Sequence, residues 1–257
     1  MLLTVDIGNT NITLGTYDKD DSLVFVARFA TDKSRTCDQY AIELSDIFKL
    51  YNKNINDVDG AVICSVVPSL TDTLSKALIL ASKIEALIVG PGIKTGLNIL
   101  IDNPAQLGAD IVAGAVAAIS KYPLPCAVFD MGTATTLSVI DSKANFLGVT
   151  IMPGVIVSMD ALSARSAQLP QVDFSAPESV IGKNTIDSMK AGLVYGNAAM
   201  LDGIIDRVSN ELSAKPTVIA TGGLSKDIIP HCIHEIVFND TLILDGLMIM
   251  YKKNKTK

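Results

Sequence analysis

Apolar residues along this chain gather in short runs that alternate with longer stretches of helical spacing. Apolar runs of roughly four to eight residues between turn formers are typical of buried strands, whereas apolar positions three and four apart indicate amphipathic helices. The runs that predict strands lie at residues 60–67, 86–89, 126–129 and 217–220. The stretches that predict helices lie at residues 40–51, 69–80, 110–121 and 185–212. This alternation predicts an α/β fold with mixed sheets.

Two local features should shape the predicted helices. Ser69 and Thr71 are candidate N-caps, because a short side-chain oxygen can accept a hydrogen bond from the free N–H groups of a first turn. Gly192, Gly196 and Gly203 are expected to interrupt the long helix near the C-terminus, because glycine weakens a helix.

The strongest pattern is an internal repeat. Residues 5–14 read Val-Asp-Ile-Gly-Asn-Thr-Asn-Ile-Thr-Leu, and residues 129–137 read Phe-Asp-Met-Gly-Thr-Ala-Thr-Thr-Leu. Asp6 and Asp130 lie 124 positions apart, close to half the length of the chain. Each copy continues as an apolar strand into an Asp-bearing turn and a second apolar strand. Both halves of the chain are therefore predicted to open with a β-hairpin.

Composition and charge indicate a cytoplasmic protein with a large core. Of the 257 residues 49% are hydrophobic, 19% are charged, and the net charge is −6. Because basic residues cluster only at 252–257, nucleic acid and anionic membranes are poor partners. The apolar runs are shorter than the roughly 20 residues of a membrane span, and the first residues do not resemble a signal peptide.

Cysteine and histidine give only weak signals for a metal site. Four scattered cysteines without a C-x-x-C pair are expected to be buried reduced thiols. His231 and His234 flank one of them and could bind a transition metal. Further ligands at metal-site spacing do not follow, which favours a surface loop over a metal site. The cysteines are Cys37, Cys64, Cys126 and Cys232.

The first hairpin turn carries the clearest chemistry. Gly8, Asn9 and Thr10 follow a buried strand, and backbone N–H groups with a nearby hydroxyl suit phosphate oxygens. Asp6 would repel a polyphosphate unless a cation bridges them, so the pattern indicates a Mg²⁺-nucleotide rather than free phosphate. One copy alone would be a plain glycine hairpin. Two copies favour a pair of hairpins that clamp one nucleotide in a cleft between the halves.

A third element is the pair Gly222 and Gly223, which follows the predicted strand at 217–220. A glycine pair allows the close backbone approach that an adenosine pocket needs. Together with the two hairpins it resembles the actin, hexokinase and Hsp70 superfamily. The resemblance implies duplicated RNase H-like halves, residues 1–111 and 112–257, with an ATP cleft between them.

Within that superfamily, a series of short motifs resembles type III pantothenate kinases over nearly the whole chain. The resemblance implies an ATP-dependent kinase that phosphorylates pantothenate in the first step toward coenzyme A. It also implies a homodimer, Mg²⁺, and a monovalent cation, K⁺ or NH₄⁺. The motifs lie, in order, at residues 6–10, 64–68, 90–96, 102–104, 108–110, 130–136, 153–154, 167–170 and 182–185.

The resemblance further implies roles for single residues. Asp110 would be the general base that takes the proton of the substrate's primary hydroxyl, although it also suits the N-cap of the following helix. Asp130 would bind the monovalent cation. The residues that would hold the ATP phosphates are Asp6, Ile7, Gly8, Asn9, Thr10, Asn11, Ile12, Thr13 and Thr133. Those that would bind pantothenate are Gly108, Ala109, Asp110, Ile111 and Thr185.

Two positions depart from the family's pattern. Ile111 stands where the family has an arginine, and Ile101 stands where it has a tyrosine. Neither isoleucine can donate a side-chain hydrogen bond, and loss of the arginine should leave Asp110 easier to protonate. The chain is thus expected to be a pantothenate kinase of lower affinity, a kinase for a different small alcohol, or a non-catalytic nucleotide-binding regulatory protein. In the first case the substrate carboxylate would need another cation, from Arg165, Lys94 or Lys183.

Overall fold

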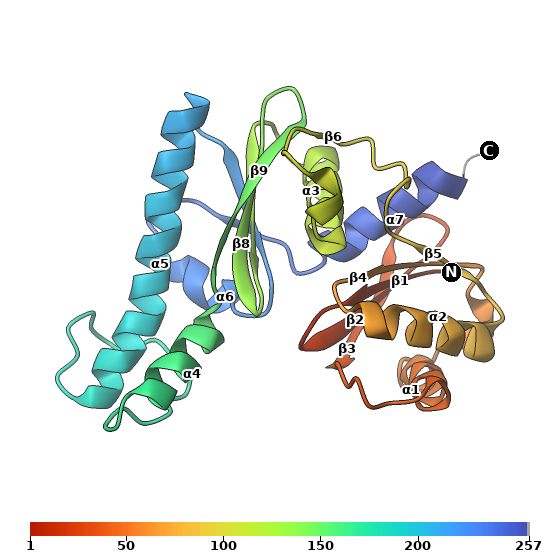
Figure 1. The fold of residues 1–257 in the computed structure, drawn as a ribbon, viewed down its shortest axis with the longest axis horizontal. Helices are drawn as coiled ribbons and strands as arrows, with labels where there is room; N and C mark the ends of the chain where they lie inside the picture. The colour runs from red at the N-terminus through yellow and green to blue at the C-terminus, as the bar shows by residue number, and fades with distance from the viewer. Residues whose placement is uncertain (256–257) are drawn as a thin grey trace. The chain divides into compact units, whose positions relative to one another are not determined.

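The computed structural model describes residues 1–255, which form two compact units (Figure 1). Unit 1 contains Met1–Gly96, Asn103–Ala117 and the C-terminal residues from Thr241. Unit 2 contains Leu97–Asp102 and Ala118–Asp240. This division differs from the expected boundary between residues 111 and 112, because the last helix packs on the first sheet.

A five-stranded mixed sheet forms the centre of unit 1, in the order β3-β2-β1-β4-β5. The first three strands are antiparallel neighbours, whereas β4 and β5 run parallel to β1. The bounds are β1 Leu2–Ile7, β2 Asn11–Tyr17, β3 Leu23–Ala30, β4 Gly60–Ser65 and β5 Ala86–Ile88.

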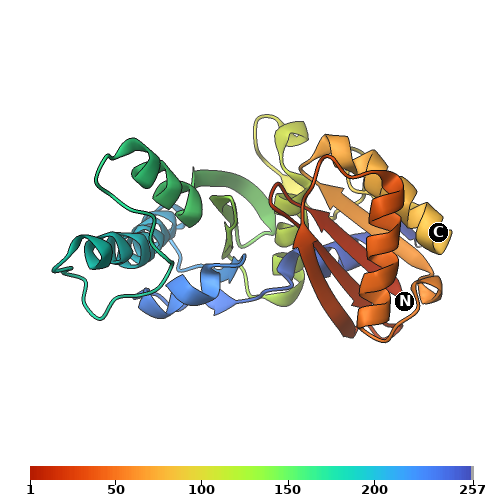
Figure 2. The ribbon, with the colours of Figure 1, turned by 90° about the horizontal axis from the view of Figure 1, so that it is seen from below.

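Helices cover both faces of this sheet. Alternate side chains of β1, Leu3, Val5 and Ile7, join a core with the helices α1 (Cys37–Leu50) and α2 (Pro68–Ser82). In Figure 2, α1 lies across the red strands of this sheet. On the other face, Leu2 and Tyr17 pack against Leu244 and Met248 of α7 (Leu242–Lys255). The short 3₁₀ helices η1 and η2 span Ile55–Asp57 and Pro104–Gln106.

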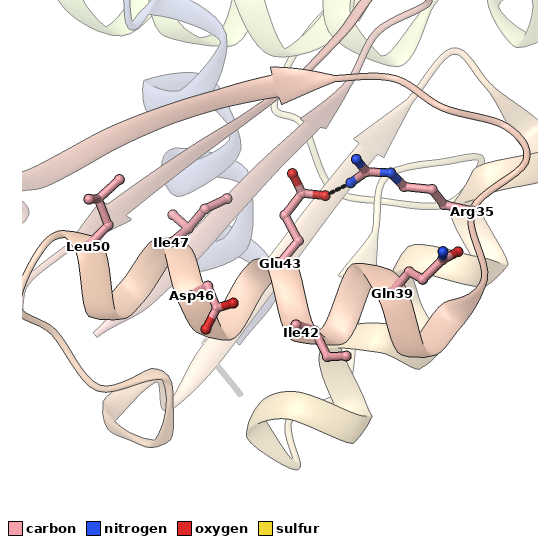
Figure 3. Close-up of a pocket in the computed structure, with 7 residues that line it drawn as sticks. All are labelled: Arg35, Gln39, Ile42, Glu43, Asp46, Ile47 and Leu50. Carbon is pink, nitrogen blue, oxygen red and sulfur yellow. Dashed lines mark hydrogen bonds and ion pairs between the residues drawn. The ribbon is translucent and has the colours of Figure 1, made fainter.

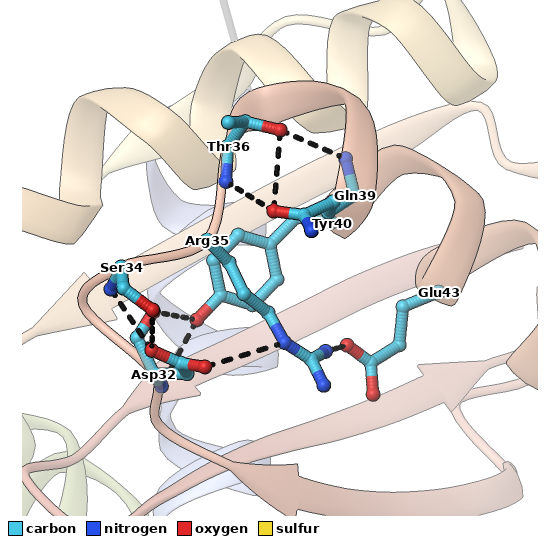
Figure 4. Close-up of polar contacts among 7 residues, drawn as sticks. All are labelled: Asp32, Ser34, Arg35, Thr36, Gln39, Tyr40 and Glu43. Atoms are coloured by element: carbon cyan, nitrogen blue, oxygen red, sulfur yellow. Dashed lines mark hydrogen bonds and ion pairs between the residues drawn. The ribbon is translucent and has the colours of Figure 1, made fainter.

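The start of α1 is fixed by polar contacts that the apolar pattern did not reveal. Thr36 and Gln39 form a reciprocal capping box, so the helix begins at Cys37 rather than Tyr40. Figure 4 shows these contacts beside the ion pairs that join Arg35 to Asp32 and Glu43. Capping therefore extends the helix by three residues beyond its amphipathic stretch.

Two expectations about helix ends and interruptions were wrong. Neither Ser69 nor Thr71 caps α2, because the helix already begins at Pro68. Proline suits the first helical position, where a backbone N–H would have no partner within the helix. The helix α5 runs without interruption from Thr185 to Leu212. Its apolar side chains, including Met189 and Leu201, join the core of unit 2, and this burial outweighs the roughly 1 kcal/mol that each glycine costs.

Unit 2 is built on a six-stranded mixed sheet in the order β11-β10-β7-β8-β9-β6. Strands β7, β8 and β9 form an antiparallel meander, and β10 and β11 run parallel to β7. Apart from the added β6, this repeats the topology of unit 1, so the predicted α/β fold with mixed sheets is confirmed. The bounds are β6 Asn98–Ile99, β7 Cys126–Met131, β8 Ala134–Ile140, β9 Asn145–Pro153, β10 Thr217–Thr221 and β11 Val237–Phe238.

The remaining helices include some that the sequence did not predict. Helix α4, Val155–Arg165, follows β9 directly and packs beside α5 in unit 2. The helix α3 runs from Ala109 to Lys121, and its residues pass from unit 1 to unit 2 after Ala117. The short helices α6 and η3 span Ser225–Ile228 and Ile229–His231.

The cysteines are all free, but they differ in burial. Cys64 and Cys126 are buried as expected, whereas Cys37 and Cys232 are only half-buried, because each lies at the edge of its core cluster. Among residues 1–255, no group of three or more His, Cys, Asp or Glu side chains could hold a metal ion. No helix in the same range has the length and apolar character needed to cross a membrane.

Candidate functional site

The turn between β1 and β2 is held by hydrogen bonds at both of its ends. The Gly8 N–H donates to the Asn11 carbonyl at 3.0 Å. Thr31 anchors the turn from behind: its hydroxyl donates to the Gly8 carbonyl at 2.7 Å, and its N–H donates to the Thr10 carbonyl at 2.9 Å. Asn9 is exposed, as are its two successors. The turn therefore presents polar groups on a fixed backbone, which suits an anionic ligand.

The residues Asp6–Thr13 divide between two faces of the sheet. The side chains of Ile7 and Ile12 are fully buried in the core, so only their backbone is available to a ligand. Asp6 and Thr13 pair across the strands on the opposite face and are half-buried. Within the predicted phosphate-binding segment, the side chains of the two isoleucines therefore pack in the core.

Asp6 is the most perturbed carboxyl group at this site. Burial raises its pKa from 3.8 to about 6, and the nearby Asp110 adds to the rise. A hydrogen bond from the Cys64 thiol, at 3.1 Å, and the charge of Arg28 act in the opposite direction. Burial raises the pKa of the Cys64 thiol well above its usual range, so the thiol keeps its proton and donates it to this bond.

Asp110 lies in the first turn of α3, close enough to Asp6 for their charges to interact. Its Oδ1 accepts a hydrogen bond from the Ile111 N–H at 2.8 Å, and burial raises its pKa. The alternative role of Asp110 as N-cap is wrong, because the Gly108 carbonyl accepts the first helical bond from Val112. A Cβ on Gly108 would collide with the Asp110 carboxylate, so glycine here leaves room for that group.

In unit 2, the second copy of the motif lies at the end of β7. Asp130 is half-buried and pairs with Thr136 on one side and Thr221 on the other. Thr133 is exposed in the turn that follows. Gly222 approaches this turn so closely that a Cβ would lie 2.5 Å from the Met131 carbonyl oxygen, and its φ of +96° also favours glycine. The structure thus brings the second hairpin and the glycine pair together.

Thr185 lies elsewhere in unit 2, at the start of α5, where Asn184 is the N-cap. It lines a pocket of about 780 Å³ between α4, α5 and the segment that joins them. Lys183 is the single charged side chain among the described residues that line it. The lining residues are Ser158, Leu162, Leu169, Gly182, Lys183, Asn184, Thr185, Ser188, Met189, Gly192, Leu193 and Asn197.

Each unit therefore holds its own set of predicted residues. Asp6–Thr13 and Gly108–Ile111 lie in unit 1, whereas Asp130, Thr133 and Thr185 lie in unit 2. A further concavity of about 640 Å³ lies on the exposed face of α1 and is crossed by the pair Arg35–Glu43 (Figure 3). None of the predicted site residues lines it.

Cys64 and Arg28 are the two residues near Asp6 that residue patterns did not select. Cys64 lies in one of the recognised motifs, but only the parallel pairing of β4 with β1 places it beside Asp6. Arg28 lies on β3, opposite Thr13. The pairing of predicted strands, rather than any motif, is the signal that could have found them.

Comparison with solved structures shows the fold. An activator of 2-hydroxyisocaproyl-CoA dehydratase from Clostridium difficile, solved with bound ADPNP, is similar with a TM-score of 0.53 at 12% identity, over 99% of this chain and 95% of that one. An inorganic polyphosphate/ATP-glucomannokinase from Arthrobacter gives 0.51 at 14% identity, over 98% of both chains. These likenesses confirm the predicted α/β fold.

Sequence comparison shows the family. The model of type III pantothenate kinases matches residues 2–207. The type III pantothenate kinase of Citrifermentans bemidjiense is 44% identical over 255 residues, which cover 99% of this chain and 100% of that one. That of Halalkalibacterium halodurans is 42% identical over 254 residues, with the same coverage. The motifs, the duplicated sheets and these matches lead to one conclusion: the chain belongs to the type III pantothenate kinase family.

Proposed function

We propose that this protein transfers the γ-phosphate of ATP to the primary hydroxyl of pantothenate, with Asp110 as the general base. The observation that carries this proposal is the pair Asp6 and Asp110, two interacting carboxyl groups beside a turn of phosphate-binding type. Burial raises the pKa of Asp110, so its carboxylate is a better proton acceptor than an exposed one. Phosphoryl transfer needs positioning and charge neutralisation more than a strong base, which suits a carboxylate.

The residues present fit a bound Mg²⁺. Magnesium binds oxygen ligands and is usually held by one or two carboxylates together with substrate phosphates, so a cluster of three protein ligands is not required. Asp6 supplies such a carboxylate at the phosphate-binding turn. When bound, Mg²⁺ neutralises charge on the phosphates. We assign the monovalent cation, K⁺ or NH₄⁺, to the half-buried Asp130 in unit 2.

We further propose that Lys183 pairs with the carboxylate of pantothenate, because Ile111 supplies no charge for it. Lys183 and Thr185 line the same pocket, whose apolar residues, such as Leu162 and Met189, would contact the dimethyl group of the substrate. Arg165 and Lys94 do not line it. A lysine is a mobile point charge, so it should bind the carboxylate less specifically than the forked arginine.

A kinase for a different small alcohol is the second candidate. The half-buried Ile111 lies directly after the proposed base and donates only its backbone N–H, which favours an apolar substrate group at that point. In this case the carboxylate would contribute nothing to recognition.

The test is ADP release with Mg²⁺-ATP and pantothenate, pantetheine or pantothenyl alcohol. We expect the highest kcat/KM for pantothenate, and loss of turnover with retained ATP binding in Asp110→Asn. Equal values with and without the carboxylate would favour the second candidate. ATP binding without turnover on any of these alcohols would instead favour the non-catalytic regulatory protein. Light scattering of the same sample tests the homodimer that we also propose.

A further inference from the structure

We propose that Cys64 is a positioning residue for Asp6: its thiol holds one carboxylate oxygen, so that the other oxygen faces the nucleotide-bound Mg²⁺. The inference deepens the proposed function and rests on it only in requiring that Asp6 faces a Mg²⁺-nucleotide. Packing alone would give this buried thiol no polar role, and the proposal assigns it one.

The geometry of the contact is defined by the sheet. Strand β4 runs parallel to β1, in a register that places Cys64 directly beside Asp6. The Cys64 Sγ lies 3.1 Å from Asp6 Oδ1, well within the range of a hydrogen bond to sulfur. Cys64 is 0% exposed, so its thiol is shielded from water on the side of the core.

The two sides of Asp6 are chemically different. On the β2 side its neighbour is Thr13, and beyond Thr13 lies the exposed Arg28 on β3. On the β4 side its neighbour is the thiol, which is a weak donor. A weak donor can fix one carboxylate oxygen while withdrawing little of its charge, so the group stays an effective cation ligand.

The second half of the chain repeats this strand register. Asp130, the counterpart of Asp6, stands beside Thr221 on the neighbouring parallel strand, in the same register in which Cys64 stands beside Asp6. Thr221 is buried and, like cysteine, carries a small side chain with one donor. A buried small donor beside the motif aspartate is therefore common to both repeats, which a purely apolar packing role would not require.

The test compares Cys64→Ala, which removes the donor, with Cys64→Ser, which keeps one. Cys126→Ala is the matched control, because Cys126 is equally buried but lies in unit 2 without a carboxylate contact. Binding of Mg²⁺-ADPNP is measured by calorimetry, and KM for Mg²⁺-ATP and for pantothenate by ADP release. Thermal unfolding of the three variants reports the effect of packing separately.

We expect Cys64→Ala to weaken Mg²⁺-ADPNP binding and raise KM for Mg²⁺-ATP about three- to tenfold, the range of one hydrogen bond. KM for pantothenate should not change, and Cys64→Ser and Cys126→Ala should bind the nucleotide like the unaltered protein. In a protein that already carries Asp6→Asn, Cys64→Ala should have no further effect on nucleotide binding, because the carboxylate that the thiol positions for Mg²⁺ is then absent.

Equal nucleotide affinity in Cys64→Ala and the unaltered protein would overturn the proposal, as would equal losses in Cys64→Ala and Cys64→Ser. If Cys64→Ala does not fold, Cys64→Val provides the comparison without a donor. Because ADPNP binding needs no pantothenate, a normal Cys64 effect in a protein that does not phosphorylate pantothenate would refute the proposed substrate alone.

Discussion

Replacement of Asp6 by asparagine should stabilise the protein while weakening its binding of Mg²⁺-nucleotide. The Asp6 carboxyl has a pKa of about 6, against 3.8 for the free group, because burial disfavours its charge. This difference corresponds to about 3 kcal/mol of folding free energy at neutral pH. Asparagine keeps the shape and an acceptor for the Cys64 thiol, but it carries no charge.

The size of this stabilisation depends on pH in a defined way. Below 3.8 the carboxyl is neutral in both the folded and the unfolded chain, so the two proteins should be equally stable. Between 3.8 and about 6 the folded state holds a proton that the unfolded state has lost, so raising the pH destabilises the unaltered protein. Above about pH 6 the advantage of Asp6→Asn should be constant, with Tm higher by roughly 5–10 °C.

Thermal unfolding from pH 4 to pH 8, with calorimetry of Mg²⁺-ADPNP binding at pH 8, tests this reasoning. Asp141→Asn is the matched control, because hydrogen bonds from Asn145 lower the Asp141 pKa and the substitution should act in the opposite direction. A lower Tm for Asp6→Asn at pH 8, or a difference in Tm that does not vary with pH, would refute the burial argument. Undiminished nucleotide binding would remove Asp6 from the Mg²⁺ site.

Three further substitutions test the substrate site and the core. Ile111→Arg should lower KM for pantothenate about tenfold, the effect of one charged hydrogen bond, and an unchanged KM in steady-state kinetics would mean that the carboxylate binds elsewhere. Lys183→Met should raise KM for pantothenate but not for pantothenyl alcohol; equal effects on both would exclude a carboxylate pair. Tyr17→Phe should cost about 1–3 kcal/mol in denaturant unfolding, because the Tyr17 hydroxyl donates to the buried Asp245 at 2.9 Å. Tyr51→Phe, which removes an exposed bond to Val26, should cost less, and equal losses would contradict the burial argument.

The two hairpins could be predicted because their signals are local. The apolar runs and the turn residues of each hairpin lie within about 25 positions, and the repeat between Asp6 and Asp130 identified the duplication. The matching strand orders of the two sheets follow from that repeat. The two hairpins that carry the candidate site residues were therefore predictable from the motifs alone.

Features that depend on contacts between distant segments could not be predicted in this way. The contact between Asp6 and Cys64 requires the pairing of β1 with β4, and the packing of α7 on β1 joins opposite ends of the chain. The additional N-cap role expected for Asp110 was wrong, because the sequence alone does not show which carbonyl accepts the first helical bond. Burial, not glycine content, determined that α5 runs without interruption.

The position of α7 has a consequence for how the protein is made. The face of the first sheet that carries Leu2 and Tyr17 is covered by Leu244 and Met248, which leave the ribosome more than 200 residues later. Until then, this apolar face of the nascent chain has no native partner. A fragment that ends at residue 111 should for the same reason aggregate, whereas unit 1 should become an independent folding unit only when residues 241–255 are rejoined to its N-terminal segments.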